Sequence, residues 1–193
     1  MITTRPGAPL LTSLSRSGDH EVDSGENEKL MTTTPQSRIT TDNDSVITEI
    51  EIAAPPDRVF RALIEREQAL QWGTGEAFEI TLWEMDARPG GKWHFVSKEK
   101  KGTGAAKAFD HHGEILQFDP PRLLEYSWFA NWHPDPAHRT IVRWDLMPTK
   151  SGTNLKVTHS NLAALPGAAQ GYGQGWPGLL QQIKNFIEKP VEK

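Results

Sequence analysis

The sequence predicts an α+β domain in which seven antiparallel strands and two short helices precede one long C-terminal helix. Three observations carry this prediction: apolar and polar residues alternate in short runs from Ser45 onward, turn residues separate the runs, and an apolar helical stripe lies near the C-terminus. At 193 residues the chain is long enough for one domain with a tail and too short for two full domains.

Residues 1–44 differ from the rest in composition and predict a disordered tail before a domain over residues 45–193. Thr, Ser, Asp, Glu, Gly and Pro dominate the segment, and its isolated apolar residues follow neither a helical nor a strand period. Such a segment buries too little apolar surface to offset the entropy lost on ordering. Met31 is a second candidate translation start, because Thr32–Asp44 leads directly into the patterned region.

The first expected elements are a strand and two short helices. Apolar and acidic residues alternate at the end of Val46–Ile52, as in a strand with one buried face. Pro55-Pro56-Asp57 then provides a helix start, because proline fits the first turn and an acidic side chain favours the positive end of the helix. Glu67–Trp72 predicts the second helix.

Six further strands and a closing helix complete the pattern. The strands are expected at Phe78–Leu82, Trp93–Val96, Phe109–Phe118, Leu123–Ala130, Thr140–Leu146 and Asn154–Ser160. Turn-forming groups such as Pro89-Gly90 and Asp119-Pro120-Pro121 stand between them. After Trp176-Pro177, apolar residues recur at helical spacing to Lys189 and predict an amphipathic helix.

Charge and composition exclude several classes of protein. The 25 Asp and Glu residues outnumber the 21 Lys and Arg residues, so no basic field exists for a nucleic-acid partner. Without cysteine the chain has no disulfide, thiolate metal site or cysteine nucleophile, which fits a cytoplasmic protein. No apolar run approaches the roughly 18 residues that cross a bilayer, so no membrane insertion is expected.

Seven groups of residues follow one another in order over about residues 45–189. They are Ala53–Leu63, Gln71-Trp72, Arg88–Phe95, Gly113–Ile115, Asp119–Leu123, Thr153–His159, and Trp176 with Leu179-Leu180. Together they resemble the activator of heat-shock protein 90 ATPase homologue-like family of the SRPBCC (START-like) superfamily. The resemblance implies a helix-grip fold, in which the curved sheet wraps the C-terminal helix and leaves a cavity between them.

Two departures from the family stand out. Its members usually extend the last helix for several residues before the Trp, whereas helix breakers are expected to break or delay it here: Gly171, Gly173, Gly175 and Pro177. In the co-chaperones that name the family, this domain follows a separate N-terminal domain that resembles the chief ATPase-stimulating element. Here the polar tail stands in that place, which weakens the hypothesis of a stress-linked co-chaperone.

The large aromatic side chains provide most of the expected ligand-binding set. Trp93 and Phe95 share one face of their strand, and Tyr126 and Trp128 share one face of theirs. The resemblance places a cavity beside these faces and Trp176 at its entrance, while pure core packing is the alternative interpretation. The expected ligand-binding residues are Trp72, Trp93, Phe95, Tyr126, Trp128, His159 and Trp176.

Polar candidates for the cavity are few. His159 lies on an apolar strand face and is expected, with Tyr126 and Arg143, to orient a ligand; a hydrogen-bonded core histidine is the alternative. His94 is expected to line the same cavity. His111-His112 are strand neighbours whose side chains point to opposite faces and cannot readily chelate one ion, so a structural or surface role is favoured and no metal site is expected.

The first functional hypothesis is therefore binding of a small apolar or aromatic ligand, with no catalytic residues and no cofactor. The sequence contains no Gly-x-Ser-x-Gly elbow or comparable signature of a nucleophile. A polyketide cyclase-like enzyme is the alternative, and an ionisable pair in the cavity, such as His159 with Glu84 or Glu114, would favour it. A co-chaperone with a chaperone partner is the third hypothesis.

Overall fold

The computed structural model describes residues 35–74, 78–99 and 108–189. Its elements along the chain are β1 (Ser37–Ile39), β2 (Val46–Ile52), α1 (Pro56–Ile64), α2 (Arg66–Trp72), β3 (Phe78–Met85), β4 (Lys92–Glu99), β5 (Ala108–Asp119), β6 (Leu123–Ala130), β7 (Thr140–Pro148), β8 (Thr153–Ser160) and α3 (Ala168–Glu188). The expected order of a strand, two short helices, six strands and a closing helix is confirmed, with one further strand at the start.

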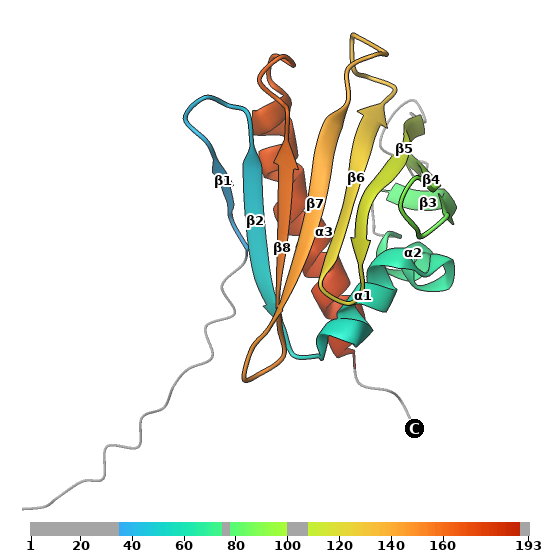
Figure 1. The fold of residues 1–193 in the computed structure, drawn as a ribbon, viewed down its shortest axis with the longest axis vertical. Coiled ribbons are helices and arrows are strands. Elements are labelled where there is room, and N and C mark those ends of the chain that lie inside the picture. Colours follow the sequence, from blue (N-terminus) through green and yellow to red (C-terminus); the bar gives the residue numbers. More distant parts are fainter. Residues whose placement is uncertain (1–34, 75–77, 100–107, 190–193) are drawn as a thin grey trace, which may run out of the picture. The chain divides into compact units, whose positions relative to one another are not determined.

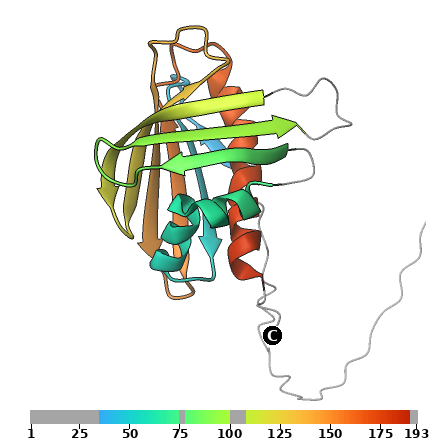
Figure 2. The same ribbon diagram turned by 90° about the vertical axis from the view of Figure 1, so that its right-hand side faces the viewer.

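Within these ranges the strands form one eight-stranded antiparallel sheet in the order β1-β2-β8-β7-β6-β5-β4-β3. Helix α3 packs across one face of the sheet, and α1 and α2 lie near one end of that helix (Figure 1). Strands β3 to β5 cross the direction of β7 and β8 steeply, so that the sheet curls around α3 (Figure 2). This is the helix-grip arrangement.

The core follows the alternation of the strands. Buried and partly exposed side chains alternate without interruption along β6 and β8, and along β7 as far as Leu146. The inward side chains of the central strands include Val142, Leu155 and Val157, each with no exposed surface. They pack against the buried face of α3, which includes Leu180 and Ile183. The inward face of the sheet is thus held against α3.

Strand β1 corrects the expectation of a disordered tail over residues 1–44, since it lies inside that segment. Its three residues pair with β2, and the Oγ atoms of Ser37 and Thr48 lie 2.7 Å apart in a hydrogen bond. Ile39 packs against the core, and a Cβ built on Gly173 of α3 would lie 3.3 Å from Cδ1 of Ile39. Residues 1–34 lie outside the described part of the chain.

Helix α3 corrects the expectation that glycine and proline would break or delay it. It begins at Ala168, after Gly167 at a left-handed φ of 78°, and contains Pro177 in its interior. Each internal glycine costs about 1 kcal/mol and a proline about 3 kcal/mol relative to alanine. Burial of Trp176, Leu180 and other side chains on one face of α3 offsets these costs, so tertiary packing overrides the local preference.

Candidate functional site

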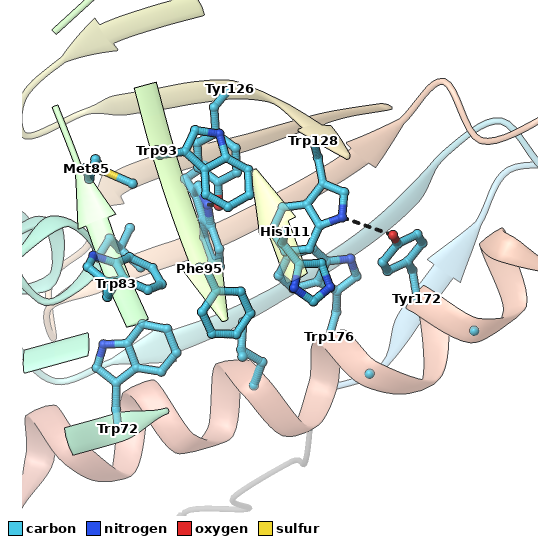
Figure 3. Close-up of a pocket in the computed structure, with 15 residues that line it drawn as sticks. Trp72, Trp83, Met85, Trp93, Phe95, His111, Tyr126, Trp128, Tyr172 and Trp176 are labelled. Carbon is cyan, nitrogen blue, oxygen red and sulfur yellow. Dashed lines mark hydrogen bonds between the residues drawn. The ribbon is translucent and has the colours of Figure 1, made fainter. Parts of the chain in front are cut away.

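A cavity of about 240 Å³ lies between the curled sheet and α3 (Figure 3). Every helix and five of the strands contribute to its wall. The lining residues are Leu63, Trp72, Trp83, Met85, Trp93, Phe95, His111, Tyr126, Trp128, Trp144, Gly171, Tyr172, Gly175, Trp176 and Leu179. None of these carries a carboxylate, an ammonium or a guanidinium group, so the described wall is uncharged apart from any protonation of His111.

Strand periodicity explains how so many rings reach one space. Residues two apart on a strand point to the same face, which brings Trp93 and Phe95 of β4 into the wall beside Tyr126 and Trp128 of β6. The expectation that each pair shares a face is confirmed. The Trp93 ring lies with its centroid 4.8 Å from that of Tyr126 and 5.0 Å from that of Trp128, so the wall is a continuous aromatic surface.

Trp83 and Met85 of β3 line the cavity although they were not among the expected residues. The register between β3 and β4 shifts between Ile80 and Leu82, as at a β-bulge. An extra residue at a bulge reverses the alternation that follows it, so the inward face passes from Ile80 to Trp83 and Met85. Their position therefore depends on an irregularity that simple alternation does not reveal.

Several indole N–H groups of the wall are hydrogen-bonded within the protein. Nε1 of Trp72 donates to the carbonyl of Ala62 at 2.7 Å, and Nε1 of Trp144 donates to the hydroxyl of Tyr126 at 2.9 Å. Because these polar atoms are already bonded, the two indoles offer mainly their carbon surface to the cavity.

Gly113 leaves room for a similar hydrogen bond from the indole of Trp93. Nε1 of Trp93 donates to the carbonyl of Ser127 at 3.0 Å. A Cβ on Gly113 would lie 2.7 Å from that nitrogen and 1.8 Å from the same carbonyl oxygen. A larger residue at this position would therefore displace the indole from the wall.

The polar end of the cavity is built around Tyr172. Its hydroxyl accepts a hydrogen bond from Nε1 of Trp128 at 3.0 Å and lies 2.9 Å from Nε2 of His133. Burial raises the pKa of Tyr172, and burial is the main cause that lowers the pKa of His133 to about 4. Both groups are therefore neutral near pH 7, and the Tyr172 hydroxyl, whose oxygen already accepts from Trp128, has its O–H free to donate a hydrogen bond to an unprotonated Nε2 of His133.

His111 lies in the wall at the same end, between Phe95 and Trp128. Its ring centroid lies 5.1 Å from that of Phe95 and 4.6 Å from that of Trp128, and only 8 % of the residue is exposed. Neither ring nitrogen has a hydrogen-bond partner among the described residues, and Nδ1 is fully enclosed. Burial is the main cause that lowers the pKa of His111 to about 4, so the ring is neutral near pH 7.

The expectation that His111 and His112 point to opposite faces is confirmed. His112 is half-exposed on the outer face, where Asp110 lies between it and His94. The distances are 3.3 Å from Oδ1 of Asp110 to Nδ1 of His112 and 3.1 Å from Oδ2 to Nε2 of His94. The expectation that His94 lines the cavity is therefore wrong, whereas His111, expected to have a structural or surface role, does line it.

His159 does not line the cavity and is a core histidine. It has no exposed surface, and its Nε2 lies 2.7 Å from Oγ1 of Thr140. The Thr140 hydroxyl also donates to the carbonyl of Trp128 at 3.2 Å, so it accepts from a protonated Nε2. The aromatic ring of Tyr172, with its centroid 4.0 Å away, covers His159. The expected contact of His159 with a ligand is not supported by this position.

Two other expectations for the site are corrected. Trp176 is 6 % exposed and packs against Trp144 at 5.5 Å between ring centroids, so it is a buried wall residue rather than an entrance residue. Arg143 lies on the outer face, in ion pairs with Glu125 and Asp145 at 3.3 and 2.9 Å. The remaining expected wall residues, Trp72, Trp93, Phe95, Tyr126 and Trp128, line the cavity.

The structure does not form the ionisable pair that would have favoured an enzyme. Glu84 is exposed and Glu114 forms an ion pair with Lys92, whereas His159 is enclosed in the core. Among the described residues, no group of three or more His, Cys, Asp and Glu side chains is arranged to hold a metal ion. None of the helices in the described ranges is long and apolar enough to cross a bilayer.

Comparisons with known proteins agree with this architecture. The model of the family described as activator of Hsp90 ATPase homolog 1-like protein matches residues 53–188. No curated protein matches the chain.

Solved bacterial structures share the fold at low sequence identity. A protein from Arthrobacter aurescens is 17% identical, with a TM-score of 0.68 over 83% of this chain and 95% of its own. A protein from Rhodobacter sphaeroides is 18% identical, with a TM-score of 0.66 over 80% and 97%. A protein from Aeromonas hydrophila, described as AHSA1-like, is 18% identical, with a TM-score of 0.61 over 77% and 99%.

Proposed function

Because the chain belongs to the activator of Hsp90 ATPase homolog 1-like protein family, we propose that it binds a small, uncharged, largely apolar ligand in the cavity beneath α3. The observation that carries the proposal is the wall itself, in which aromatic rings from five strands and two helices face one cavity. A ligand there gains about 25 cal/mol for each Å² of apolar surface removed from water.

The uncharged character of the ligand follows from the wall. A buried carboxylate or ammonium costs several kcal/mol unless a partner of opposite charge is present. His111 and Tyr172, the titratable lining residues with Tyr126, have pKa values shifted in the directions that keep them neutral at pH 7. A charged ligand would therefore find no compensating group among the described lining residues.

The same pKa shifts argue against the cyclase-like alternative. General acid–base catalysis works best when the pKa of the catalytic group lies near the working pH. The pKa of His111 is lowered to about 4 and that of Tyr172 is raised, so both groups are poor proton carriers near pH 7. A binding function uses these groups in the state that they already have.

Native mass spectrometry of the purified full chain is the direct test, because a ligand that co-purifies adds its own mass to the protein. A titration with N-phenyl-1-naphthylamine, an uncharged probe that fluoresces in apolar surroundings, measures the capacity of the cavity. Phe95→Lys places an ammonium in the wall and should weaken probe binding roughly tenfold or more.

Val96→Lys is the matched control, since the neighbouring strand residue points to the outer face. It should bind the probe as the unchanged chain does. Failure of the unchanged chain to bind the probe, with no ligand mass in native spectra, would overturn the proposal. A chaperone retained with the tagged chain in a pull-down, together with that failure, would favour the co-chaperone alternative instead.

A further inference from the structure

Two glycines of α3, Gly171 and Gly175, stand one helical turn apart and both line the cavity. Apart from the adjoining backbone of the helix and the two chain neighbours, a Cβ built on either would meet no described atom within 4 Å. Gly173, between them, is different, because its Cβ would press on Ile39 of β1 at 3.3 Å. Packing against β1 therefore accounts for glycine at 173 and not for glycine at 171 or 175.

Glycine in a helix interior lowers stability relative to alanine, and no neighbouring side chain requires glycine at positions 171, 175 or 178. Of these three glycines, Gly171 and Gly175 line the cavity and Gly178 does not. Their effect is to leave the backbone of α3 bare on the side that faces the cavity. A flat molecule could lie there in contact with the helix backbone.

A second and independent feature of the same end is the unpaired imidazole of His111. It is nine-tenths buried, lies in the wall, and has no hydrogen-bond partner for either ring nitrogen among the described residues. Buried polar groups are ordinarily hydrogen-bonded, so an unpaired one in a cavity wall can bond to a ligand group. Nε1 of Trp83 and Nε1 of Trp176 are also unpaired in this wall, but an indole only donates, whereas the imidazole of His111 can donate or accept. Figure 3 shows His111 at the end of the cavity where Trp176 and Tyr172, the chain neighbours of Gly175 and Gly171, also lie.

We propose that the ligand is a flat, uncharged ring compound with one hydroxyl or carbonyl group, that its ring lies on the bare backbone at Gly171 and Gly175, and that its polar group hydrogen-bonds to His111. This inference rests on the proposed binding function and makes it more specific. Neutral imidazole carries one donor and one acceptor nitrogen, and no protein partner fixes which is which, so it can pair with either group. His111 and the two glycines then set the specificity of the site.

The test uses two probes that differ by one hydroxyl group, naphthalene and 2-naphthol, titrated into the full chain and followed by NMR. The unchanged chain should bind 2-naphthol roughly three- to tenfold more tightly, the range expected for one hydrogen bond. His111→Phe keeps a flat ring in the wall and removes the hydrogen bond. It should abolish that preference and leave naphthalene affinity within about twofold.

The bare helix backbone at Gly171 and Gly175, the glycine seat, is tested by filling it with a side chain. Gly175→Leu should weaken binding of both probes roughly tenfold or more, because its side chain takes the place of the ligand ring. Gly178→Leu is the matched control: it adds the same side chain to the same helix at an exposed position that does not line the cavity. Gly175→Ala and Gly171→Ala give a smaller loss, and they test the seat if the leucine variant does not fold.

The outcomes test the ring position and the hydrogen bond to His111 separately. Undiminished binding of both probes by folded Gly175→Leu and by the alanine variants would overturn the seat, and a preserved preference in His111→Phe would overturn the hydrogen bond. If the unchanged chain binds N-phenyl-1-naphthylamine but neither naphthalene probe, the cavity binds ligands and this inference is wrong. If it binds none of the three, the proposed function itself fails.

Discussion

The hydroxyl of Tyr172 lies 3.0 Å from Nε1 of Trp128, and this hydrogen bond joins α3 to β6 at the polar end of the cavity. The same hydroxyl lies 2.9 Å from Nε2 of His133, which extends the chain of hydrogen bonds to the segment after β6. One oxygen atom thus links three separate parts of the fold.

Tyr172→Phe should lower the free energy of unfolding by about 1–3 kcal/mol, because it leaves the N–H of Trp128 and Nε2 of His133 unpaired. Urea denaturation measures the change. Tyr126→Phe, which removes the acceptor for Trp144, gives the reference value for the loss of one hydrogen bond. A Tyr172→Phe variant as stable as the unchanged chain would show that the linkage contributes nothing.

His159→Ala should lower the free energy of unfolding by about 2–4 kcal/mol and leave ligand affinity nearly unchanged. The side chain is fully buried, bonds to Thr140 and does not line the cavity. Denaturation and probe titration of the same variant separate the two effects. The opposite result, a stable variant with weak binding, would restore the role that the sequence alone predicted for this residue.

Stability should fall as pH is lowered from about 6.5 toward 4. Burial lowers the pKa of His111 and of His133 from 6.5 to about 4, so in this range the unfolded chain binds protons that the folded chain does not. For His111 the loss by pH 4 is about 3 kcal/mol, and above pH 6.5 the contribution is constant.

Denaturation midpoints at a series of pH values measure this slope. His111→Phe should reduce the slope, with His133 and His159 accounting for the rest, whereas His112→Phe, on the half-exposed neighbour, should leave it unchanged. Equal slopes in the unchanged chain and in His111→Phe would show that His111 titrates normally in the folded state.

Deleting residues 1–43 should lower the free energy of unfolding relative to deleting residues 1–34. The longer deletion removes the ladder between β1 and β2 and the contact of Ile39 with the core. The expected difference is about 1–3 kcal/mol, of the order for burying one aliphatic side chain. Coincident denaturation curves for the two shortened chains would show that β1 adds no stability.

The sequence predicts the fold well where a pattern repeats over several residues. Strands β6, β7 and β8 each alternate over at least seven residues, and all were expected within two residues of their observed ends. Strand β1 has three residues, too few for a period, and it depends on pairing with β2. In α3, local glycine and proline preferences gave the wrong start because packing against the sheet decides it.

The sequence predicts a wall residue where the alternation of a regular strand decides which face it lies on. It does not do so where a register shift or the choice between the two faces decides. Trp93 and Phe95 were found because alternation alone puts them on one side. Trp83 was missed because the expected strand ended at Leu82, one residue before it, and because the bulge near Leu82 reverses the alternation that Ile80 begins. His111 was missed because alternation separates it from His112 without showing which of the two points inward.

The hydrogen-bonded indoles of the wall also affect the rate at which a ligand enters the cavity. Trp72, Trp93, Trp128 and Trp144 each donate Nε1–H to a protein acceptor, so each indole is held by a hydrogen bond before any ligand arrives. A preorganised cavity binds its ligand without a prior rearrangement of side chains. The association rate should then depend on ligand concentration and on entry into the cavity, and ligands that bind more tightly should differ mainly in how slowly they dissociate.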